Sequence, residues 1–245
     1  IEGNRVYAEA GLPLAKLAQA TAQAGLTGLE WCIAVPGTVG GAIRGNAGAF
    51  GGEVKDTLVS ARITDGSEVK EYSNKQMNFR YRSSRIKDHK GSELVLDALF
   101  QLEPADAQES TKRVKEMLAK KFADQPMGEL CAGCLFKNIE LEPGKEVLAK
   151  SSKGTPTPKF FEDIKVEHAD FIKNGKVPAG WIIEQLGFKA REPHAGIKVS
   201  EKHANFLVNT GEGSAKAVKE LANTIKKEAK ALYGIELEEE VQFVE

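Results

Sequence analysis

The chain contains 245 residues, with 34 lysines and arginines against 35 aspartates and glutamates, which gives a net charge of -1. This length accommodates one large domain or two of modest size, with a substantial core in either case. The balanced charge provides no overall field that would attract nucleic acid or an anionic membrane. No run approaches the roughly 18 consecutive apolar residues of a membrane span, and three cysteines are too few for a disulfide framework. We therefore expect a soluble protein of the reducing cytoplasm.

The first hundred residues are predicted to alternate strands with a single helix. Gly3-Asn4 favours a hairpin turn in front of the strand-like run 5–10. Because the partner strand would precede the first residue, we interpret the chain as beginning inside a folded unit. A helix is predicted over 13–24, with a proline in its first turn and a glycine directly after it. The pattern then predicts a hairpin over 57–72 and a strand over 94–102.

A change in composition after Glu103-Pro104 predicts a domain boundary, with one domain over 1–104 and a second over 105–245. The second domain begins with a lysine-rich helical pattern whose apolar face is Val114, Met117, Leu118 and Phe122. The stretch 140–177 is polar and contains several proline and glycine turns. We interpret it as an insertion that carries a turn-rich excursion.

The end of the chain has the clearest periodicity. An amphipathic helix is predicted to end at Gly234, and its apolar face consists of Val218, Leu221, Ala222, Ile225, Ala229 and Leu232. A strand is predicted over 235–244, because apolar residues alternate there with acidic or polar ones. The apolar set is Ile235, Leu237, Val241 and Phe243, and the opposite set is Glu236, Glu238, Glu240 and Gln242.

A dense group of glycines follows Val35-Pro36, namely Gly37, Gly40, Gly41, Gly45, Gly48, Gly51 and Gly52. Glycine turns expose backbone N–H groups that bind phosphate oxygens without a formal positive charge. The segment has neither the Lys-Ser/Thr of a P-loop nor a strand-adjacent G-x-G-x-x-G, which disfavours a nucleoside triphosphate or a Rossmann cofactor. From the residues alone, an anion cradle and a plain set of tight turns both remain open.

The glycine-rich region resembles a known family. Its segments 28–31, 35–42 and 46–53 are similar to the FAD-binding stretch of the UDP-N-acetylenolpyruvoylglucosamine reductases, apart from Ala34, where that family usually has glycine. The resemblance implies an FAD site that contacts the pyrophosphate and the flavin ring. Its residues would be Pro36, Gly37, Thr38, Val39, Gly40, Gly41, Ala42, Asn46, Gly48 and Ala49.

The segment 79–84, Phe-Arg-Tyr-Arg-Ser-Ser, resembles the family's Tyr-Arg-x-Ser motif and places Arg82 at the catalytic arginine. An arginine suits this role because its planar fork holds a carboxylate and stabilises the enolate that develops from it. The alternative is an ordinary surface cation beside Arg80 and Arg85.

The segment 132–138 resembles the family's Gly-Ser-x-Phe-Lys-Asn motif, with Cys134 in the position of the serine. The resemblance makes Cys134 the proton donor and Asn138 a substrate contact. A thiol, with an ordinary pKa of about 8.5, is more acidic than a hydroxyl and is largely protonated at neutral pH. Cys131 and Cys134 also spell C-x-x-C, which suggests zinc or dithiol exchange. No second pair exists and the histidines lack zinc spacing, so we expect no metal.

Three further matches lie towards the end of the chain. The segment 178–185 resembles the family helix that carries a substrate-contacting glutamine, here Gln185, and 199–209 matches a segment in which His203 is expected to be structural. The segment 237–241 resembles Leu-x-Pro-Glu-Val, with Glu239 in place of the proline, and identifies Glu240 as the catalytic glutamate. The alternative for Glu240 is a solvated acidic strand face.

Taken together, the resemblance implies an α+β protein of two domains. The first would be an FAD-binding domain of the vanillyl-alcohol-oxidase/PCMH type without its N-terminal lobe, and the second a C-terminal substrate-binding domain. The implied activity is the NADPH-dependent reduction of UDP-N-acetyl-3-O-(1-carboxyvinyl)glucosamine to UDP-N-acetylmuramate, through FAD, for peptidoglycan synthesis. The sequence does not give the oligomeric state, for which a monomer is our expectation. Two alternatives are a UDP-sugar-binding module without redox activity and a flavin oxidase of the same superfamily with another substrate.

Overall fold

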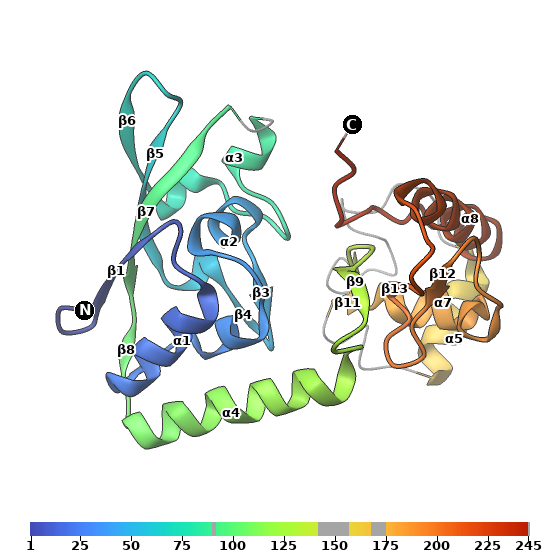
Figure 1. Ribbon diagram of the computed structural model, residues 1–245, viewed down its shortest axis with the longest axis horizontal. Helices are drawn as coiled ribbons and strands as arrows, with labels where there is room; N and C mark the ends of the chain where they lie inside the picture. Colours follow the sequence, from blue (N-terminus) through green and yellow to red (C-terminus); the bar gives the residue numbers. More distant parts are fainter. Residues whose placement is uncertain (90–91, 142–156, 168–174, 245) are drawn as a thin grey trace. The chain divides into compact units, whose positions relative to one another are not determined.

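The computed structural model describes residues 1–89, 92–141, 157–167 and 175–244 (Figure 1). The chain divides into two compact units, Ile1–Ala123 and Asp124–Glu245, each with a hydrophobic core of its own. Helices and strands are mixed in both units, as expected for an α+β protein. We describe the two units separately.

The first unit is built on a four-stranded antiparallel sheet in the order β1-β7-β5-β6. Its strands are β1 (Arg5–Glu9), β5 (Leu58–Thr64), β6 (Val69–Ser73) and β7 (Leu94–Gln101), and the short pairs are β2 (Leu26–Thr27) with β8 (Glu103–Pro104) and β3 (Gly48–Ala49) with β4 (Gly52–Glu53). Its helices are α1 (Leu14–Gln23), α2 (Val39–Gly45), α3 (Arg85–Asp88) and α4 (Ala107–Asp124), with 3-10 turns η1 (Glu30–Ala34), η2 (Val54–Asp56) and η3 (Asn74–Met77). The predicted helix, hairpin and strand of this region are confirmed.

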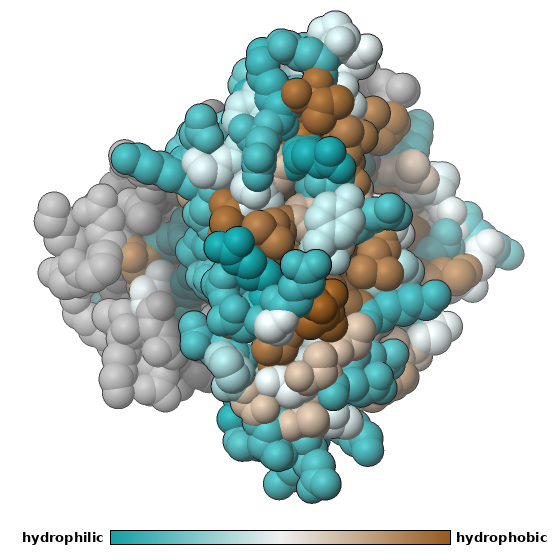
Figure 2. Space-filling view, turned by 90° about the vertical axis from the view of Figure 1, so that its left-hand side faces the viewer, coloured by the Kyte–Doolittle hydropathy of each residue, from teal (hydrophilic) through white to brown (hydrophobic). Residues whose placement is uncertain are grey.

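One face of the sheet forms the core of the first unit. In β1, Val6 and Ala8 are buried while Arg5, Tyr7 and Glu9 are exposed, because successive side chains of a strand point to opposite faces. The buried face packs with α1 and α2, whose Leu17 and Ile43 belong to the same core. The other face is open, and Tyr7 on it is exposed. Figure 2 shows hydrophilic and hydrophobic areas interspersed on this side of the molecule.

A charged pair ties two central strands together on the open face. Asp97 of β7 lies opposite Arg62 of β5, and Arg62 Nε donates to Asp97 Oδ1 at 2.9 Å while Nη2 donates to Oδ2. The hydrogen bonds from Arg62 hold the pKa of Asp97 below its ordinary value, although partial burial acts in the opposite direction.

The second unit contains a three-stranded antiparallel sheet in the order β12-β13-β9. Its strands are β9 (Leu130–Cys134), β12 (Ile197–Val199), β13 (Phe206–Asn209) and the pair β10 (Ile139–Glu140) with β11 (Lys176–Val177). Its helices are α5 (Pro158–Glu167), α7 (Ala179–Gln185) and α8 (Ala215–Tyr233), with the 3-10 turn η4 (Phe188–Ala190). The predicted terminal helix is confirmed as α8, which begins after the capping hydroxyl of Ser214 and ends at Gly234 with φ 70°.

Part of the stretch interpreted as a polar insertion belongs to the core. Phe160 and Ile164 of α5 are fully buried, and the Phe160 ring packs edge-on against Tyr233 of α8 at 5.6 Å and Trp181 of α7 at 6.4 Å. The interpretation of 140–177 as a turn-rich excursion is therefore wrong for α5, because Phe160 and Ile164 lie one turn apart on this helix and are both buried in the core of the second unit. Residues 142–156 and 168–174 of that stretch lie outside the described residues.

Two other sequence expectations differ from the structure. The division between the units falls after Ala123 rather than at 104/105, because Val114 of α4 is buried in the core of the first unit. Phe122, expected on the same face, is 51% exposed. The predicted strand 235–244 is not a regular strand, because its pairing is limited to isolated bridges such as the one between Phe136 and Glu239.

Candidate functional site

The glycines of the segment after Val35 fall into two classes. A Cβ on Gly52 would lie 2.3 Å from Trp31 Cδ1, one on Gly48 would lie 2.6 Å from Gly52 O, and one on Gly40 would lie 2.9 Å from Ala10 Cβ. These three glycines are therefore required by the packing of the protein against itself. Gly37, in contrast, has no atom within 4 Å of a Cβ position and a φ of 118°.

Gly37 and Gly41, which are not packed against the protein in this way, lie on an exposed surface that suits a diphosphate. Pro36, Gly37, Thr38 and Gly41 are exposed, and the Thr38 hydroxyl makes no hydrogen bond that caps α2. A hydroxyl beside bare backbone is a donor set of the kind that holds phosphate oxygens. Two other amides point inward, since Val39 N donates to Leu12 O at 3.0 Å and Gly40 N to Ala10 O at 2.9 Å. The N–H groups of Gly37, Thr38 and Gly41, together with the Thr38 hydroxyl, thus fit the pyrophosphate of FAD, and the exposed Pro36 lies beside them without a donor of its own.

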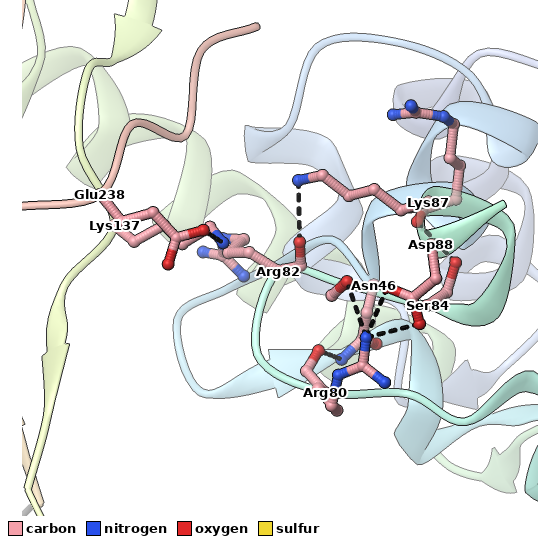
Figure 3. A network of polar contacts seen from close by, with 10 residues as sticks. Asn46, Arg80, Arg82, Ser84, Lys87, Asp88, Lys137 and Glu238 are labelled. Carbon is pink, nitrogen blue, oxygen red and sulfur yellow. Dashed lines mark hydrogen bonds and ion pairs between the residues drawn. The ribbon is translucent and has the colours of Figure 1, made fainter. Parts of the chain in front are cut away.

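Asn46, expected as a cofactor contact, has a side chain that is fully buried. Its Nδ2 donates to Glu53 Oε2 at 2.8 Å and to Arg80 O at 3.0 Å, while its Oδ1 accepts from Lys55 N at 3.1 Å (Figure 3). Its backbone is left-handed, with φ 44°. The side chain of Asn46 therefore connects the glycine-rich segment to the turn that carries Arg82.

Arg82 occupies a strained turn position. Arg80 N donates to Ser83 O at 3.0 Å and Ser83 N donates to Arg80 O at 3.1 Å, so Tyr81 and Arg82 form a two-residue turn. Arg82 has φ 52°, which glycine and asparagine adopt far more readily than arginine. Strain of this kind is concentrated at functional sites. Arg82 Nη2 donates to Gly48 O at 2.8 Å, which directs the guanidinium to the glycine-rich segment.

The turn is fixed from several directions. Lys87 Nζ donates to Arg82 O at 3.1 Å, and the buried Ser84 Oγ donates to Arg44 O at 2.7 Å (Figure 3). Arg80, next to it, forms an ion pair with Asp88 through both carboxylate oxygens. Of the two arginines in the predicted motif, Arg80 is thus held in a local ion pair, and the strained Arg82 is directed to the candidate cofactor surface.

In the second unit, Cys134 is the last residue of β9 and leads directly into the segment Leu135–Lys137. One edge of this segment bonds to Asn205: Leu135 N donates to Asn205 O at 2.7 Å. The other edge bonds to the terminal segment: Glu240 N donates to Leu135 O at 2.8 Å, and Lys137 N to Glu238 O at 2.9 Å. The segment Leu135–Lys137 therefore joins Cys134 to Glu240 through the backbone.

A bulge in β9 determines how its two cysteines are presented. Cys134 pairs with Phe206 and Cys131 with Val208, so three steps along β9 match two steps along β13. Residues paired across an antiparallel ladder lie on the same face, and Phe206 and Val208 share one face. Cys131 and Cys134 consequently share that face, with Cys131 exposed and Cys134 half-buried.

Burial raises the pKa of the third thiol, Cys32, which favours its neutral form.

The two predicted substrate contacts lie at opposite ends of α7. Asn138 Oδ1 accepts from Ala179 N at 3.1 Å at the beginning of this helix, and Gln185 is its last residue and exposed. The second unit therefore connects Cys134, Asn138 and Glu240 through one backbone segment, with Gln185 one short helix away. Arg82 and the predicted cofactor residues belong to the first unit.

His203 supports the backbone, as expected. Its ring lies 4.8 Å from that of Phe206, and its Nδ1 accepts from Asn205 N at 3.3 Å. Burial lowers the pKa of His203, which favours the neutral ring that this acceptor role requires. Asn205, which the sequence analysis did not single out, is the buried residue at the centre of these contacts. Only its place in the matched segment 199–209 could have indicated it.

Two searches of the described part of the chain bear on other classes of function. Among the described residues, no group of three or more His, Cys, Asp and Glu side chains could hold a metal ion. Within the same residues, no helix is both long and apolar enough to cross a membrane.

Comparison with known proteins matches both units. Residues 125–244 match the model of the UDP-N-acetylenolpyruvoylglucosamine reductase C-terminal domain, and residues 1–69 match the FAD binding domain model. A UDP-N-acetylenolpyruvoylglucosamine reductase of Solibacter usitatus is 35% identical over 251 residues, which cover 99% of this chain and 72% of the relative. The chain belongs to this reductase family.

Further members agree with this UDP-N-acetylenolpyruvoylglucosamine reductase assignment. The reductase of Carboxydothermus hydrogenoformans is 38% identical over 98% of this chain and 67% of its own length. The crystal structure of UDP-N-acetylenolpyruvylglucosamine reductase from Thermus caldophilus superposes with a TM-score of 0.71 at 26% identity, covering 99% of this chain and 73% of that one. The expected two-domain α+β fold with an FAD-binding domain is confirmed. The chain spans about two thirds to three quarters of these relatives.

Proposed function

We propose that this reductase converts UDP-N-acetyl-3-O-(1-carboxyvinyl)glucosamine to UDP-N-acetylmuramate in peptidoglycan synthesis, with NADPH as the reductant and FAD as the cofactor. The observation that carries the proposal is the segment Leu135–Lys137, which connects the predicted proton donor Cys134 to the predicted catalytic Glu240 by hydrogen bonds. Family membership supplies the reaction.

The cofactor site would lie in the first unit. The exposed Gly37, Thr38 and Gly41 would hold the FAD pyrophosphate through backbone N–H groups and the Thr38 hydroxyl, and Pro36, which has no N–H, would line the same surface. This surface would be supported from the protein interior by Val39, Gly40, Ala42 and Asn46. It would continue towards Arg82 along Gly48 and Ala49. When bound, FAD would take up a hydride from NADPH and pass it on to the methylene carbon of the enolpyruvyl double bond.

The side chains of this chain would manage charge and protons. Reduction places negative charge on the substrate carboxylate, and the guanidinium of Arg82 would stabilise it with a planar pair of N–H donors. The Sγ–H of Cys134 would give its proton to the enolpyruvyl carbon that bears the carboxylate. Glu240 would help to stabilise the enolate. Asn138 and Gln185 would bind the UDP-sugar. This reaction requires no metal and no partner beyond the two nucleotides, and we place the enzyme in the cytoplasm as a monomer.

The experiment that tests this function separates the two half-reactions in the FAD-loaded protein. In Cys134→Ala, reduction of the flavin by NADPH should proceed at the rate of the unaltered protein, because that step takes no proton from Cys134. Reoxidation by the enolpyruvyl substrate should slow by a factor on the order of 10² to 10⁴. Cys134→Ser should recover much of the rate, since a hydroxyl also donates a proton.

Cys131→Ala is the matched control, because Cys131 lies on the same strand and face but has no assigned role. Its two half-reactions should match those of the unaltered protein. Rapid reoxidation of the flavin in Cys134→Ala would contradict the assignment of the proton donor. A lack of turnover of the enolpyruvyl substrate by the unaltered, FAD-loaded protein would contradict the function itself.

A further inference from the structure

The buried amide of Asn205 bonds to the backbone of Phe136 in both directions. Asn205 is 2% exposed, its Oδ1 accepts from Phe136 N at 2.9 Å and its Nδ2 donates to Phe136 O at 2.7 Å. Together with the bond from Leu135 N to Asn205 O, the residue makes three hydrogen bonds to two consecutive residues. The side chain thus acts as one more peptide group directly before the start of β13.

These bonds hold the inner edge of the segment Leu135–Lys137, whose outer edge carries the terminal segment. Leu135 is the shared residue, because its N–H bonds to Asn205 and its carbonyl oxygen accepts from Glu240 N at 2.8 Å. Phe136 likewise bonds to the Asn205 side chain and forms a bridge with Glu239. A displacement at Asn205 would therefore move Cys134 and Glu240 together.

Asn205 is itself held in place. Its N–H donates to His203 Nδ1 at 3.3 Å, and Phe206 N donates to His203 O at 2.9 Å. A Cβ on Gly180 of α7 would lie 3.7 Å from Asn205 Cβ, so the helix packs closely over this residue. An amide in such surroundings has one orientation, since Phe136 N–H only donates and Phe136 O only accepts.

We propose that Asn205 is a positioning residue of the reductase, which sets the register of Leu135–Lys137 and thereby places the Cys134 thiol and the Glu240 carboxylate relative to one another. This inference rests on the proposed function for the meaning of that placement. The contacts of Asn205 themselves are independent of it.

The test compares Asn205→Asp, directly before β13, with a matched control at the last residue of that strand. Asn205→Asp keeps the size of the side chain but replaces the donor to Phe136 O by a carboxylate oxygen, which would repel that carbonyl. Asn209→Asp is the control, because Asn209 also makes three bonds to backbone, accepting from Gly211 N and Gly213 N and donating to Gly213 O. Those bonds serve the loop after β13 and not the segment that carries Cys134.

The first measurement is the rate at which iodoacetamide alkylates Cys134, with the modified peptide mapped and Cys131 as the internal reference. Asn205→Asp should raise the Cys134 rate relative to Cys131 by about tenfold, because loss of a buried hydrogen bond opens the segment more often. Asn209→Asp should leave this ratio unchanged. The second measurement is hydrogen exchange, in which the Glu240 amide should lose protection in Asn205→Asp and keep it in Asn209→Asp.

The third measurement uses the FAD-loaded protein. Asn205→Asp should lower kcat for the enolpyruvyl substrate with little change in KM and leave flavin reduction by NADPH unchanged, whereas a general loss of structure would affect both half-reactions. Equal Cys134 reactivity and equal Glu240 exchange in the two variants would overturn the proposal. If those two measurements behave as expected while the unaltered protein fails to reduce the enolpyruvyl substrate, the proposed function fails and the positioning of Leu135–Lys137 stands.

The unaltered chain provides a version of the test that does not depend on a folded variant. In hydrogen exchange under mild urea, the amides of Phe136 and Glu240 should open together, with the same free energy and the same urea dependence, because they belong to one bonded segment. Independent opening of the two amides would overturn the proposal.

Discussion

At the scale of single residues, Arg82 shows how a backbone conformation selects between chemically similar side chains. Four arginines lie within the segment 79–85 and in the adjoining helix α2, namely Arg80, Arg82, Arg85 and Arg44. Arg85 forms an ion pair with Glu93, and Arg80 forms one with Asp88. Arg82 alone among them has a left-handed backbone, a conformation that costs an arginine about 1–2 kcal/mol. Backbone strain of this kind clusters at functional sites, which agrees with the role proposed for Arg82.

The first prediction concerns that backbone. Arg82→Gly should change the free energy of unfolding by less than about 1 kcal/mol, because relief of the left-handed conformation offsets the lost hydrogen bond to Gly48 O. Turnover in the FAD-loaded protein should fall by a factor on the order of 10² or more. Urea titration and steady-state kinetics measure the two effects.

Arg82→Lys is the control for the chemistry. It keeps the charge and the strained backbone but loses the planar fork, so it should lose far more in kcat than in KM. An Arg82→Lys variant with unchanged kcat would refute the role of the guanidinium.

Residue motifs could be read from the sequence, but their surroundings could not. The residues around Cys134 predicted a proton donor. The hydrogen bonds between Asn205 and Phe136, in contrast, join residues 69 positions apart, and no local sequence pattern indicates them. The glycines likewise looked alike in sequence. Whether Gly52 faces Trp31 or Gly37 faces open space depends on packing that brings η1 against β4.

At the scale of elements, alternation predicted the sheet of the first unit because one face is buried and the other is open. Val6 and Ala8 alternate with exposed residues, and β5 and β6 follow the expected hairpin. The terminal stretch has the same alternation, and Ile235 and Leu237 are indeed buried. It forms no regular strand because a strand requires a continuous partner, and periodicity says nothing about the partner.

The second prediction concerns the pair Arg62 and Asp97, which joins β5 to β7. The pKa of Asp97 is lower in the folded chain than in the unfolded chain, so its contribution to stability is present above the unfolded pKa of about 3.9 and is lost as the pH falls through the folded value. We expect the free energy of unfolding to decrease from about pH 5 downward. Asp97→Asn should lower stability at pH 7 and make this decrease less steep, as measured by urea titration at several pH values.

A double-mutant cycle provides the control for this pair. Arg62→Gln should have the same effect on the pH dependence, and the double variant should lose less than the sum of the two single losses. Other carboxyl groups also have a lowered pKa, such as Glu228, which accepts a hydrogen bond from Arg191. Every variant should therefore retain part of the decrease in stability at acid pH. Strict additivity of the two single changes would mean that the pair does not contribute to stability as a unit.

At the scale of the whole molecule, the chain has two hydrophobic cores that share no residue. Met77 is fully buried in the first and Ile225 in the second. The sequence predicted two domains because composition changes after Glu103-Pro104. It placed the boundary early because a helix pattern does not say which core the helix will join, and α4 joins the first.

The third prediction follows from the separate cores. Calorimetry should resolve two unfolding transitions, because units with independent cores need not unfold as one. Met77→Ala should destabilise one transition by about 2–5 kcal/mol and Ile225→Ala the other by a similar amount. Each substitution is the control for the other. A single transition, whose midpoint temperature both substitutions lower equally, would mean that the two cores unfold cooperatively.

The hydrogen-bonded segment Leu135–Lys137 also has a consequence for how the chain is made. Phe136 bonds to a residue 69 positions later, and Lys137 pairs with one 101 positions later. A ribosome therefore releases Leu135 and Phe136 well before either partner exists. Until Glu238 emerges, this apolar stretch has at least one open edge, which is the kind of surface that chaperones bind and that aggregates form from. The segment that organises the candidate catalytic residues thus also remains incompletely paired until the end of the chain is made.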